Sequence, residues 1–252
     1  AAKDLIGQGY HILAGSTASG VALQVAPLAA QNKVLFVSGP AATDGVTGIN
    51  KYTFRSGRQT YQDIATAASF IGDLSGKHVT VLAQDSAFGQ ANVAAVKAVL
   101  GAKGAKVDAV LAPPSATDLT PFATQAKDAK PDLLFVAWAG TTAQALWTAL
   151  SQQGVLDSTK TVTGLDVRAS YPVFASTGGK VSFLAHYVPG GTGGDAAKAM
   201  DAYLAKQSQQ SDLFRPDGFT AAQMVVHAAE NGDGDVRAMV KNMEGRSFAG
   251  GQ

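Results

Sequence analysis

The sequence predicts an α/β protein in which helices cover both faces of parallel β-sheets. The first observation is that short apolar segments of strand length alternate with longer segments whose apolar residues recur at helical spacing. The second is that strand-like segments such as 34–38 and 133–138 contain almost no polar residues, as expected for strands buried on both faces. The third is composition: 46% of the 252 residues are hydrophobic and 15% are charged, which allows a substantial core.

The strand and helix signals fall into two blocks, at about 1–57 and about 58–210. In the first block a segment at 21–31 has apolar residues at helical spacing, and a turn rich in glycine, proline and threonine occupies 39–48. The expected strands of this block are 10–14, 34–38 and 52–55, and its expected helices are 1–6 and 21–31. Strands that alternate with helices of this size form right-handed βαβ units.

The second block repeats the alternation more regularly. Its expected strands are 79–83, 107–111, 132–138, 161–165 and 182–188, and its expected helices are 61–74, 88–100, 122–129, 142–153 and 195–206. A glycine-rich loop at 189–194 and a polar connection at 212–217 interrupt the alternation. Two further helices at 219–229 and 236–244 could pack on either block, with a turn between them at 230–235, and no strand is expected after them.

Charge and residue types exclude several functional classes. The 20 basic and 19 acidic residues give a net charge of +1, whereas a nucleic-acid-binding domain shows a basic surplus on one face. The chain has no cysteine, which excludes disulfides, thiolate zinc sites, iron–sulfur clusters and cysteine nucleophiles. No apolar run reaches the ~18 residues that a membrane-spanning helix needs. The sequence therefore predicts a globular protein that does not bind nucleic acid.

The residue patterns of common catalytic and cofactor sites are absent from the sequence. Residues 178–180 read Gly-Gly-Lys but are followed by valine rather than by the Ser or Thr of a phosphate loop. No G-x-G-x-x-G joins a strand to a helix, and no serine lies in G-x-S-x-G. None of the histidines His11, His78, His186 and His227 pairs with another at i,i+4, and no carboxylate-rich cluster surrounds them, so we expect structural or surface roles. We therefore expect no metal, no cofactor and no enzymatic activity.

Uncharged polar residues gather where expected strands lead into helices. Five junctions show this pattern, at 15–20, 38–43, 84–89, 138–142 and 164–168. In open α/β sheets ligands bind at the carboxyl ends of the strands, against helix N-termini whose free amides suit a carboxylate. Ser, Thr and Asp at such positions are also ordinary helix caps, so a single junction carries little weight. Five of them in two blocks predict a binding cleft between two α/β lobes.

Segments along the whole chain match one known family in content and in order. They read AGSTASGVALQVAPLAAQNKVLFVSGPAAT (14–43), TFRSGRQTYQD (53–63), VTVLAQDSAFGQ (79–90), PDLLFVAWAGTTAQALWTAL (131–150) and GFTAAQMVVHAAE (218–230). They closely resemble type I periplasmic solute-binding proteins of ABC importers, in the branched-chain amino acid (Leu/Ile/Val) binding family. The resemblance implies two Rossmann-like lobes joined by a three-strand hinge, with a small solute bound between them. We assign residues 1–57 with 211–252 to lobe 1 and residues 58–210 to lobe 2.

The resemblance also implies which residues contact the solute. Carried over position by position, they are Ser19, Ala41, Ala42, Thr43, Phe88, Asp166 and Phe219. Ser19 and the helix-terminal amides would hold the carboxylate of the solute. Thr43 would hydrogen-bond the carboxylate or the ammonium group, and Asp166 would pair with the ammonium group in a charge-assisted bond.

Four residues bear on which solute is bound. Phe88 stands where the family often has tyrosine, so one hydroxyl is lost, and Asp166 stands where it often has glutamate. Trp138 is bulkier than the usual residue at its junction, and it is either a wall of the site or a core residue. Arg58 lies in a hinge segment, where it either serves a carboxylate of the solute or is an exposed residue. The expected ligand is a branched-chain-like amino acid or a small aromatic acid that stacks on these rings.

The setting of the protein follows from the same resemblance. Members of the family have a strand and a helix before the segment that matches 1–9 and further strand after 236–244. We therefore expect an incomplete first lobe within a longer natural chain that carries a signal peptide. We expect a monomer in the periplasm or another extracytoplasmic compartment, with or without a lipid anchor, that delivers its solute to the membrane subunits of an ABC importer. Two alternatives stay open: a cytoplasmic ligand-sensing regulator of the same fold, and a small α/β enzyme.

Overall fold

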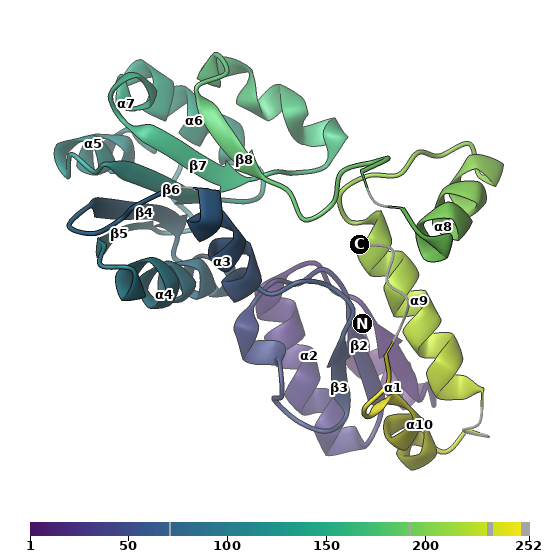
Figure 1. The fold of residues 1–252 in the computed structure, drawn as a ribbon. Coiled ribbons are helices and arrows are strands. Elements are labelled where there is room, and N and C mark those ends of the chain that lie inside the picture. The colour runs from purple at the N-terminus through teal and green to yellow at the C-terminus, as the bar shows by residue number, and fades with distance from the viewer. Residues whose placement is uncertain (71, 192, 231–233, 248–252) are drawn as a thin grey trace. The chain divides into compact units, whose positions relative to one another are not determined.

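The chain forms two compact units, each with its own sheet (Figure 1). The structure is a computed structural model that describes residues 1–70, 72–191, 193–230 and 234–247. Unit 1 contains Ala1–Gln59 and His186–Gln252, and unit 2 contains Thr60–Ala185. The chain therefore passes from one unit to the other twice, once after Gln59 and once after Ala185.

Unit 1 is built on a three-stranded parallel sheet with the order β1-β2-β3. Its elements are α1 (Ala2–Gly7), β1 (Ile12–Ala14), α2 (Ser19–Asn32), β2 (Leu35–Ser38), the 3₁₀ turn η1 (Asp44–Val46), β3 (Thr53–Arg55), α8 (Asp195–Lys206), α9 (Arg215–Ala229) and α10 (Val236–Met243). Helix α2 covers one face of the sheet, and α9 with α10 covers the other (Figure 1). The predicted parallel α/β architecture is confirmed in this unit.

The central strand β2 shows how the sheet of unit 1 is held. Successive side chains of a strand point to opposite faces. Phe36 packs with Ala22 and Ala26 of α2 in one buried cluster, whereas Leu35 and Val37 pack with residues of α9 and α10 in another. The alanines, four residues apart in α2, lie on one side of the helix and form part of its apolar face. All residues of β2 are buried, which explains why the segment has no charged residue.

Residues 186–210 lie in unit 1, whereas the sequence analysis assigned them to lobe 2. Tyr187, Met200 and Leu204 form a small buried cluster, and Phe219 of α9 packs against it. The apolar side of α8 thus packs against α9. This contact explains why the boundary of the second unit falls near residue 185 and not near residue 210.

Unit 2 is built on a five-stranded parallel sheet with the order β5-β4-β6-β7-β8. Its elements are α3 (Thr60–Phe70), β4 (His78–Gln84), α4 (Ala87–Ala102), β5 (Lys106–Ala112), α5 (Thr120–Asp128), β6 (Leu133–Ala137), α6 (Ala143–Gln152), α7 (Val155–Ser158), β7 (Lys160–Gly164), the 3₁₀ segment η2 (Arg168–Thr177) and β8 (Val181–Leu184). Every predicted strand of this block is present, which confirms the predicted alternation of strands and helices.

The strand order of unit 2 changes direction between β4 and β6. After β4 the chain adds β5 on one side, and then β6, β7 and β8 on the other. Helix α4 packs on the face that carries Val79 and Val81, while α5 and α6 pack on the face that carries Leu82 and Leu134. The connections therefore leave β4 and β6 toward opposite faces. Such a topological switch point is where open α/β sheets bind ligands, at the carboxyl ends of the strands.

The structure corrects some predicted element boundaries. The expected strand 182–188 ends at Leu184, so His186 and Tyr187 lie beyond β8. Helix α9 begins four residues earlier than expected, because Pro216 lies in its first turn, where a missing N–H and a fixed φ are tolerated. The segments α7 and η2 were not predicted. Some predictions fall partly outside the described residues. Residue 71 belongs to the expected helix 61–74, residue 192 to the loop 189–194, residues 231–233 to the turn 230–235, and residues 248–252 to the C-terminal tail.

The described ranges contain neither a candidate membrane span nor a candidate metal cluster. No helix in them is long and apolar enough to cross a membrane. Nor do they bring together three or more His, Cys, Asp or Glu side chains in a way that could hold a metal ion.

Candidate functional site

The ends of β1 and β2 in unit 1 are joined by backbone hydrogen bonds. The N–H of Gly39 donates to the carbonyl of Gly15 at 3.0 Å, and the N–H of Ala41 donates to the carbonyl of Ser16 at 3.2 Å. These bonds place the first two predicted junctions side by side at the carboxyl edge of the sheet.

Ser19 is the first residue of α2 and is only 3% exposed. Its hydroxyl oxygen is buried and has no hydrogen-bond partner within the described part of the chain. The N-cap residue, Ala18, makes no side-chain cap bond, and its carbonyl accepts from the N–H groups of Val21 and Ala22, both at 3.1 Å. The N–H groups of Ser19 and Gly20, which come before these, have no partner within the helix. A buried hydroxyl beside helix-terminal N–H groups is a donor set for a carboxylate. The carboxylate-binding role of Ser19 stays a prediction, and this geometry suits it.

The loop after β2 carries the other predicted contacts of unit 1. Ala41, Ala42 and Thr43 are buried there. The hydroxyl oxygen of Thr43 accepts from the N–H of Gly45 at 3.4 Å and so caps η1. Since a hydroxyl is also a donor, Thr43 can cap this turn and donate to a solute at the same time.

Arg55, the last residue of β3, holds this loop in place, and sequence reasoning missed it. Its guanidinium donates to the carbonyls of Ala41 (2.8 Å), Thr43 (3.1 Å), Gly57 (3.2 Å) and Arg58 (2.6 Å) and to the hydroxyl of Thr47 (2.7 Å). The five N–H donors of an arginine fork are suited to such a set of acceptors. Main-chain acceptors leave no pattern in a sequence, so its place in the segment at 53–63 was the one available signal.

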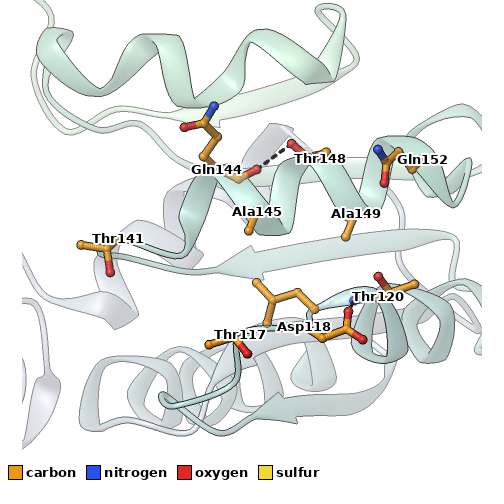
Figure 2. Close-up of a pocket in the computed structure, with 10 residues that line it drawn as sticks. Thr117, Asp118, Thr120, Thr141, Gln144, Ala145, Thr148, Ala149 and Gln152 are labelled. Atoms are coloured by element: carbon orange, nitrogen blue, oxygen red, sulfur yellow. Dashed lines mark hydrogen bonds between the residues drawn. The ribbon is translucent and has the colours of Figure 1, made fainter.

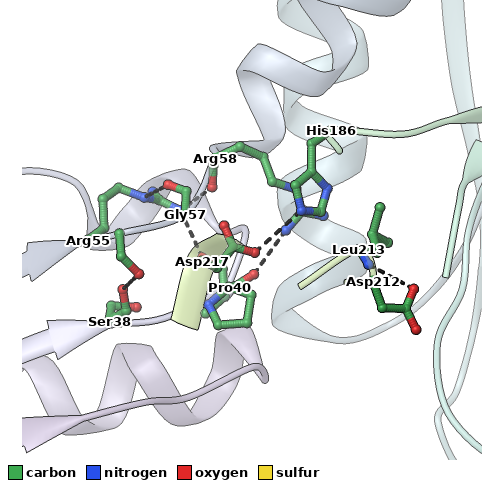
Figure 3. Close-up of polar contacts among 11 residues, drawn as sticks. Ser38, Pro40, Arg55, Gly57, Arg58, His186, Asp212, Leu213 and Asp217 are labelled. Carbon is green, nitrogen blue, oxygen red and sulfur yellow. Dashed lines mark hydrogen bonds and ion pairs between the residues drawn. The ribbon is translucent and has the colours of Figure 1, made fainter. Parts of the chain in front are cut away.

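Arg58 lies near Pro40, His186 and Asp217 within unit 1 (Figure 3). Its Nη1 donates to the carbonyl of Pro40 at 2.9 Å, and its guanidinium carbon lies 5.7 Å from the ring centroid of Phe214. The Phe214 ring lies 5.5 Å from that of His186, whose Nε2 is 3.3 Å from Oδ2 of the fully buried Asp217. Arg58 therefore braces the loop after β2. Its predicted contact with a solute carboxylate stays a prediction.

Trp138 follows β6 at the carboxyl edge of the sheet in unit 2. It is half-buried against the cluster on the α6 face of the sheet, and its indole Nε1 donates to Oγ1 of Thr142 at 3.0 Å. Gln84, the last residue of β4, donates from Nε2 to the same oxygen at 3.5 Å and accepts from the N–H of Ala139 at 3.3 Å. Trp138 thus belongs partly to the core and partly to the exposed edge. Gln84 and Thr142 lie within predicted junctions but were not singled out.

Phe88 lies in the first turn of α4, on the other face of the same sheet. Its ring is half-buried against the cluster that α4 covers. Ser86 is the N-cap of the helix, and its hydroxyl accepts from the N–H of Gly89 at 3.2 Å. The capping alternative thus holds for Ser86. Gly89 permits the close approach of helix and strand, because a Cβ there would lie 1.9 Å from the carbonyl oxygen of Gln84.

Asp166 and Phe219 complete the predicted set. Asp166 follows β7, is half-buried, and accepts from the N–H of the next residue, Val167, at 2.7 Å. Phe219 lies in α9 and packs on the cluster of Tyr187, Met200 and Leu204. Unit 1 thus contains Ser19, Ala41, Ala42, Thr43, Arg58 and Phe219, and unit 2 contains Phe88, Trp138 and Asp166.

A groove of about 450 Å³ lies between the start of α5 and α6 of unit 2 (Figure 2). Its side chains are mainly threonine and glutamine, and none of the nine predicted site residues lines it. Asp118 is the charged residue of the lining. The N–H of Thr120 donates to the Asp118 carboxylate at 3.0 Å and, with the Thr120 hydroxyl, holds the pKa of Asp118 below its usual value. A carboxylate that stays ionised disfavours a negatively charged solute, so we do not assign the groove to one.

Comparison with known proteins places this geometry in a family. The profile of the family described as "Periplasmic binding protein" matches residues 1–251. A curated relative, the Leu/Ile/Val-binding protein BraC3 of Rhizobium johnstonii, is 29% identical over 140 residues, which are 54% of this chain and 38% of the relative. The match therefore spans less than half of the length of that relative.

Solved structures share the fold over almost the whole chain. An ABC-type branched-chain amino acid transporter protein of Rhodopseudomonas palustris is 27% identical, with a TM-score of 0.72, over 99% of this chain and 69% of that one. A solute-binding protein of R. palustris in complex with 4-hydroxybenzoate is 22% identical, with a TM-score of 0.83, over 99% and 71%. A leucine-binding protein, LivK, of Thermotoga maritima is 20% identical, with a TM-score of 0.80, over 99% and 73%.

Proposed function

Because the chain belongs to the periplasmic binding protein family, we propose that it is a non-enzymatic receptor for a small solute that carries a carboxylate. The solute is a branched-chain-like amino acid or a small aromatic acid. The receptor works outside the cytoplasm as a monomer, needs no cofactor, and delivers its solute to the membrane subunits of an ABC importer. Ligand binding stabilises one conformation over another, as in other binding proteins that close on their ligands.

The hydroxyl of Ser19 is the observation that carries this proposal. A buried polar group without a partner costs the folded protein roughly 1–3 kcal/mol. Among the buried hydroxyls without a partner in the described residues, that of Ser19 is distinguished by its position beside a helix N-terminus, where a ligand carboxylate could satisfy it. The adjoining amides of α2 add the positive end of the helix dipole. Ala41, Ala42 and Thr43, which Arg55 anchors beside this helix end, supply the second side of the carboxylate grip.

The relatives support both kinds of solute. BraC3 is named for leucine, isoleucine and valine, and one R. palustris structure holds 4-hydroxybenzoate. All of these solutes carry a carboxylate, so the same grip in unit 1 suits each of them. These relatives are solute-binding proteins rather than enzymes, which favours the receptor over an α/β enzyme.

Isothermal titration calorimetry tests the proposal directly. The purified chain is titrated with leucine, isoleucine, valine, benzoate and 4-hydroxybenzoate. Replacement of Ser19 by alanine should raise the Kd of the bound solute about tenfold, or ~1.4 kcal/mol. It should leave the melting temperature of the ligand-free protein unchanged or raise it, because that hydroxyl has no partner to lose among the described residues and its unpaired burial is unfavourable.

The control is Ser158→Ala, which removes an exposed hydroxyl of α7 in unit 2 and should leave every Kd unchanged. Absence of binding by all five compounds would sink the proposal. So would chemical conversion of a bound compound, detected by mass spectrometry, which would support the enzyme alternative.

A further inference from the structure

Thr142 stands at the N-cap of α6 but does not cap it. An N-cap threonine ordinarily accepts from an amide of the first helical turn. Ser86 does this for α4 and Asp235 does it for α10, whereas Thr142 makes no side-chain cap bond. Its oxygen accepts instead from the indole of Trp138 and the amide of Gln84. The hydroxyl best placed to stabilise α6 is thus engaged in positioning an aromatic ring.

Gln84 extends this arrangement across two strands. Its amide nitrogen donates to Thr142, and its amide oxygen accepts from the N–H of Ala139, next to Trp138. Strands β4 and β6 pair directly, so the amide ties the end of one to the loop that follows the other. The ring of Trp138 is consequently fixed by its own hydrogen bond, and the loop that carries it is fixed by Gln84.

The hydrogen bonds among Gln84, Trp138 and Thr142 lie at the topological switch point of unit 2. Helices α4 and α6 begin there on opposite faces of the sheet. Phe88 lies at the start of α4, and Trp138 lies just before α6. Two half-buried aromatic rings therefore flank the carboxyl ends of β4 and β6, where a ligand is expected.

The hydrogen bonding of Trp138 limits what its exposed part can offer. Indole has one N–H donor and no acceptor, and Thr142 already takes that donor. The ring can therefore contribute only its π-face and carbon edge to a ligand. Such a surface favours another aromatic ring over an aliphatic side chain of similar size, because aromatic pairs gain from stacked and edge-to-face arrangements.

We infer that Trp138, positioned by Thr142 and Gln84, is a stacking wall that selects planar aromatic carboxylates over branched-chain amino acids. This inference rests on the proposed function and chooses between its two classes of solute. Trp138 is the contact residue, while Thr142 and Gln84 are positioning residues.

Calorimetry with sodium 4-hydroxybenzoate and L-leucine measures the selection. The unmodified chain should bind 4-hydroxybenzoate at least tenfold more tightly than leucine. Replacement of Trp138 by leucine should raise the Kd of 4-hydroxybenzoate about tenfold and change the Kd of leucine less than threefold. Circular dichroism and thermal melting check that the variant is folded.

Variants at residue 142 test the positioning role. Thr142→Val keeps the shape but removes the acceptor, and it should reduce the preference for 4-hydroxybenzoate. Thr142→Ser keeps the acceptor and should restore that preference. Since the chain has two tryptophans, a Trp147→Phe background leaves Trp138 as the sole indole emitter. In that background 4-hydroxybenzoate should quench the emission in the Thr142 and Thr142→Ser proteins and quench it less in Thr142→Val.

The outcomes separate this inference from the proposed function. Tighter binding of leucine than of 4-hydroxybenzoate would overturn the selection by Trp138 and leave the receptor proposal standing. Equal preference in Thr142→Val and in the unmodified chain would overturn the positioning role. Absence of binding by both compounds would overturn the inference, and absence of binding by isoleucine, valine and benzoate as well would overturn the proposed function.

Discussion

The carboxyl edges of the two sheets differ in the kinds of residues that form them. In unit 1 the edge is made of short residues, backbone groups and the buried hydroxyl of Ser19, and Arg55 fixes its loop through main-chain carbonyls. In unit 2 the edge is made of larger side chains, and hydrogen bonds between side chains fix the ring of Trp138. The same strand-to-helix connection thus leaves the hydroxyl of Ser19 without a partner among the described residues in unit 1, whereas in unit 2 the indole N–H of Trp138 is hydrogen-bonded.

One strand-to-helix topology can therefore serve two kinds of ligand recognition. A group common to many solutes, such as a carboxylate, is bound by amides and hydroxyls that depend little on side-chain identity. The variable part of a solute is read by side chains whose shape can change without disturbing the helix ends. Under the proposed function, unit 1 would bind the carboxylate and unit 2 would select among solutes.

We expect the greatest loss of stability from overpacking at the carboxyl edge of the sheet in unit 2. In Gly89→Ala the new Cβ would lie 1.9 Å from the carbonyl oxygen of Gln84, so α4 must move away from β4. We expect a loss of about 3 kcal/mol in the free energy of unfolding, at the upper end of usual overpacking costs. Urea denaturation followed by circular dichroism measures it.

The same helix offers a matched control. Gly101 also lies in α4, and a Cβ added there meets no atom within 4 Å. Gly101→Ala should leave stability unchanged or raise it by up to about 1 kcal/mol, because alanine has the higher helix propensity. Similar losses of unfolding free energy in the two variants would show that the close contact between Gly89 and Gln84 does not determine the stability of this edge.

The next effect concerns the edge of unit 1. Arg55→Met keeps the length of the side chain but leaves the carbonyls of Ala41 and Thr43 without their donor. We expect a loss of about 2 kcal/mol in unfolding free energy and weaker binding of every carboxylate solute. Arg55→Lys should recover little of either, since an ammonium cannot span the same acceptors. Full recovery by lysine would mean that charge, and not the fork, holds the loop.

A pair of serine variants compares the edges directly. Ser86 caps α4, so Ser86→Ala should lower the unfolding free energy by about 1 kcal/mol. Ser19→Ala should lower it by nothing measurable, since its hydroxyl has no partner to lose. Parallel urea denaturation of the two ligand-free variants measures both. An equal loss in the two would show that the Ser19 hydroxyl stabilises the ligand-free protein and is not reserved for a solute.

How far the sequence predicted the molecule can be judged from particular residues. The apolar residues that recur through 21–31, among them Ala29, and the apolar run of β2 predicted a helix on a buried strand, because such periodicity indicates burial. The start of α9 was predicted too late because the polar residues of 212–217 indicated a connection, whereas Pro216 is typical of the first turn of a helix. The unit of α8 was misassigned because an amphipathic helix shows that it packs, but not on which neighbour.

The candidate site shows the same division. The junctions were predictable, since polar residues after apolar strands mark the carboxyl edge of a parallel sheet. The partners were not, because they depend on three-dimensional geometry. Nothing in the sequence indicates that Thr142 accepts from Trp138 instead of capping α6, or that Arg55 donates to the loop after β2.

The weakest effect that we predict lies at the amino edge of the sheet in unit 2. The N–H of His78 donates to Oδ2 of Asp132 at 2.8 Å and lowers the pKa of that carboxyl, while Lys77 donates to Oδ1 and adds a weaker effect. A lowered folded-state pKa contributes stability above the unfolded-state pKa, and this contribution is lost as pH falls through the folded-state value. The stability difference between the unmodified chain and Asp132→Asn should therefore be present at neutral pH and shrink in acid.

Urea denaturation at a series of pH values, repeated in 0.5 M salt, measures this difference, and solute affinity should not change. Because the backbone N–H is the main cause, salt should leave most of the difference. A difference abolished by salt would assign it to the exposed Lys77 pair instead.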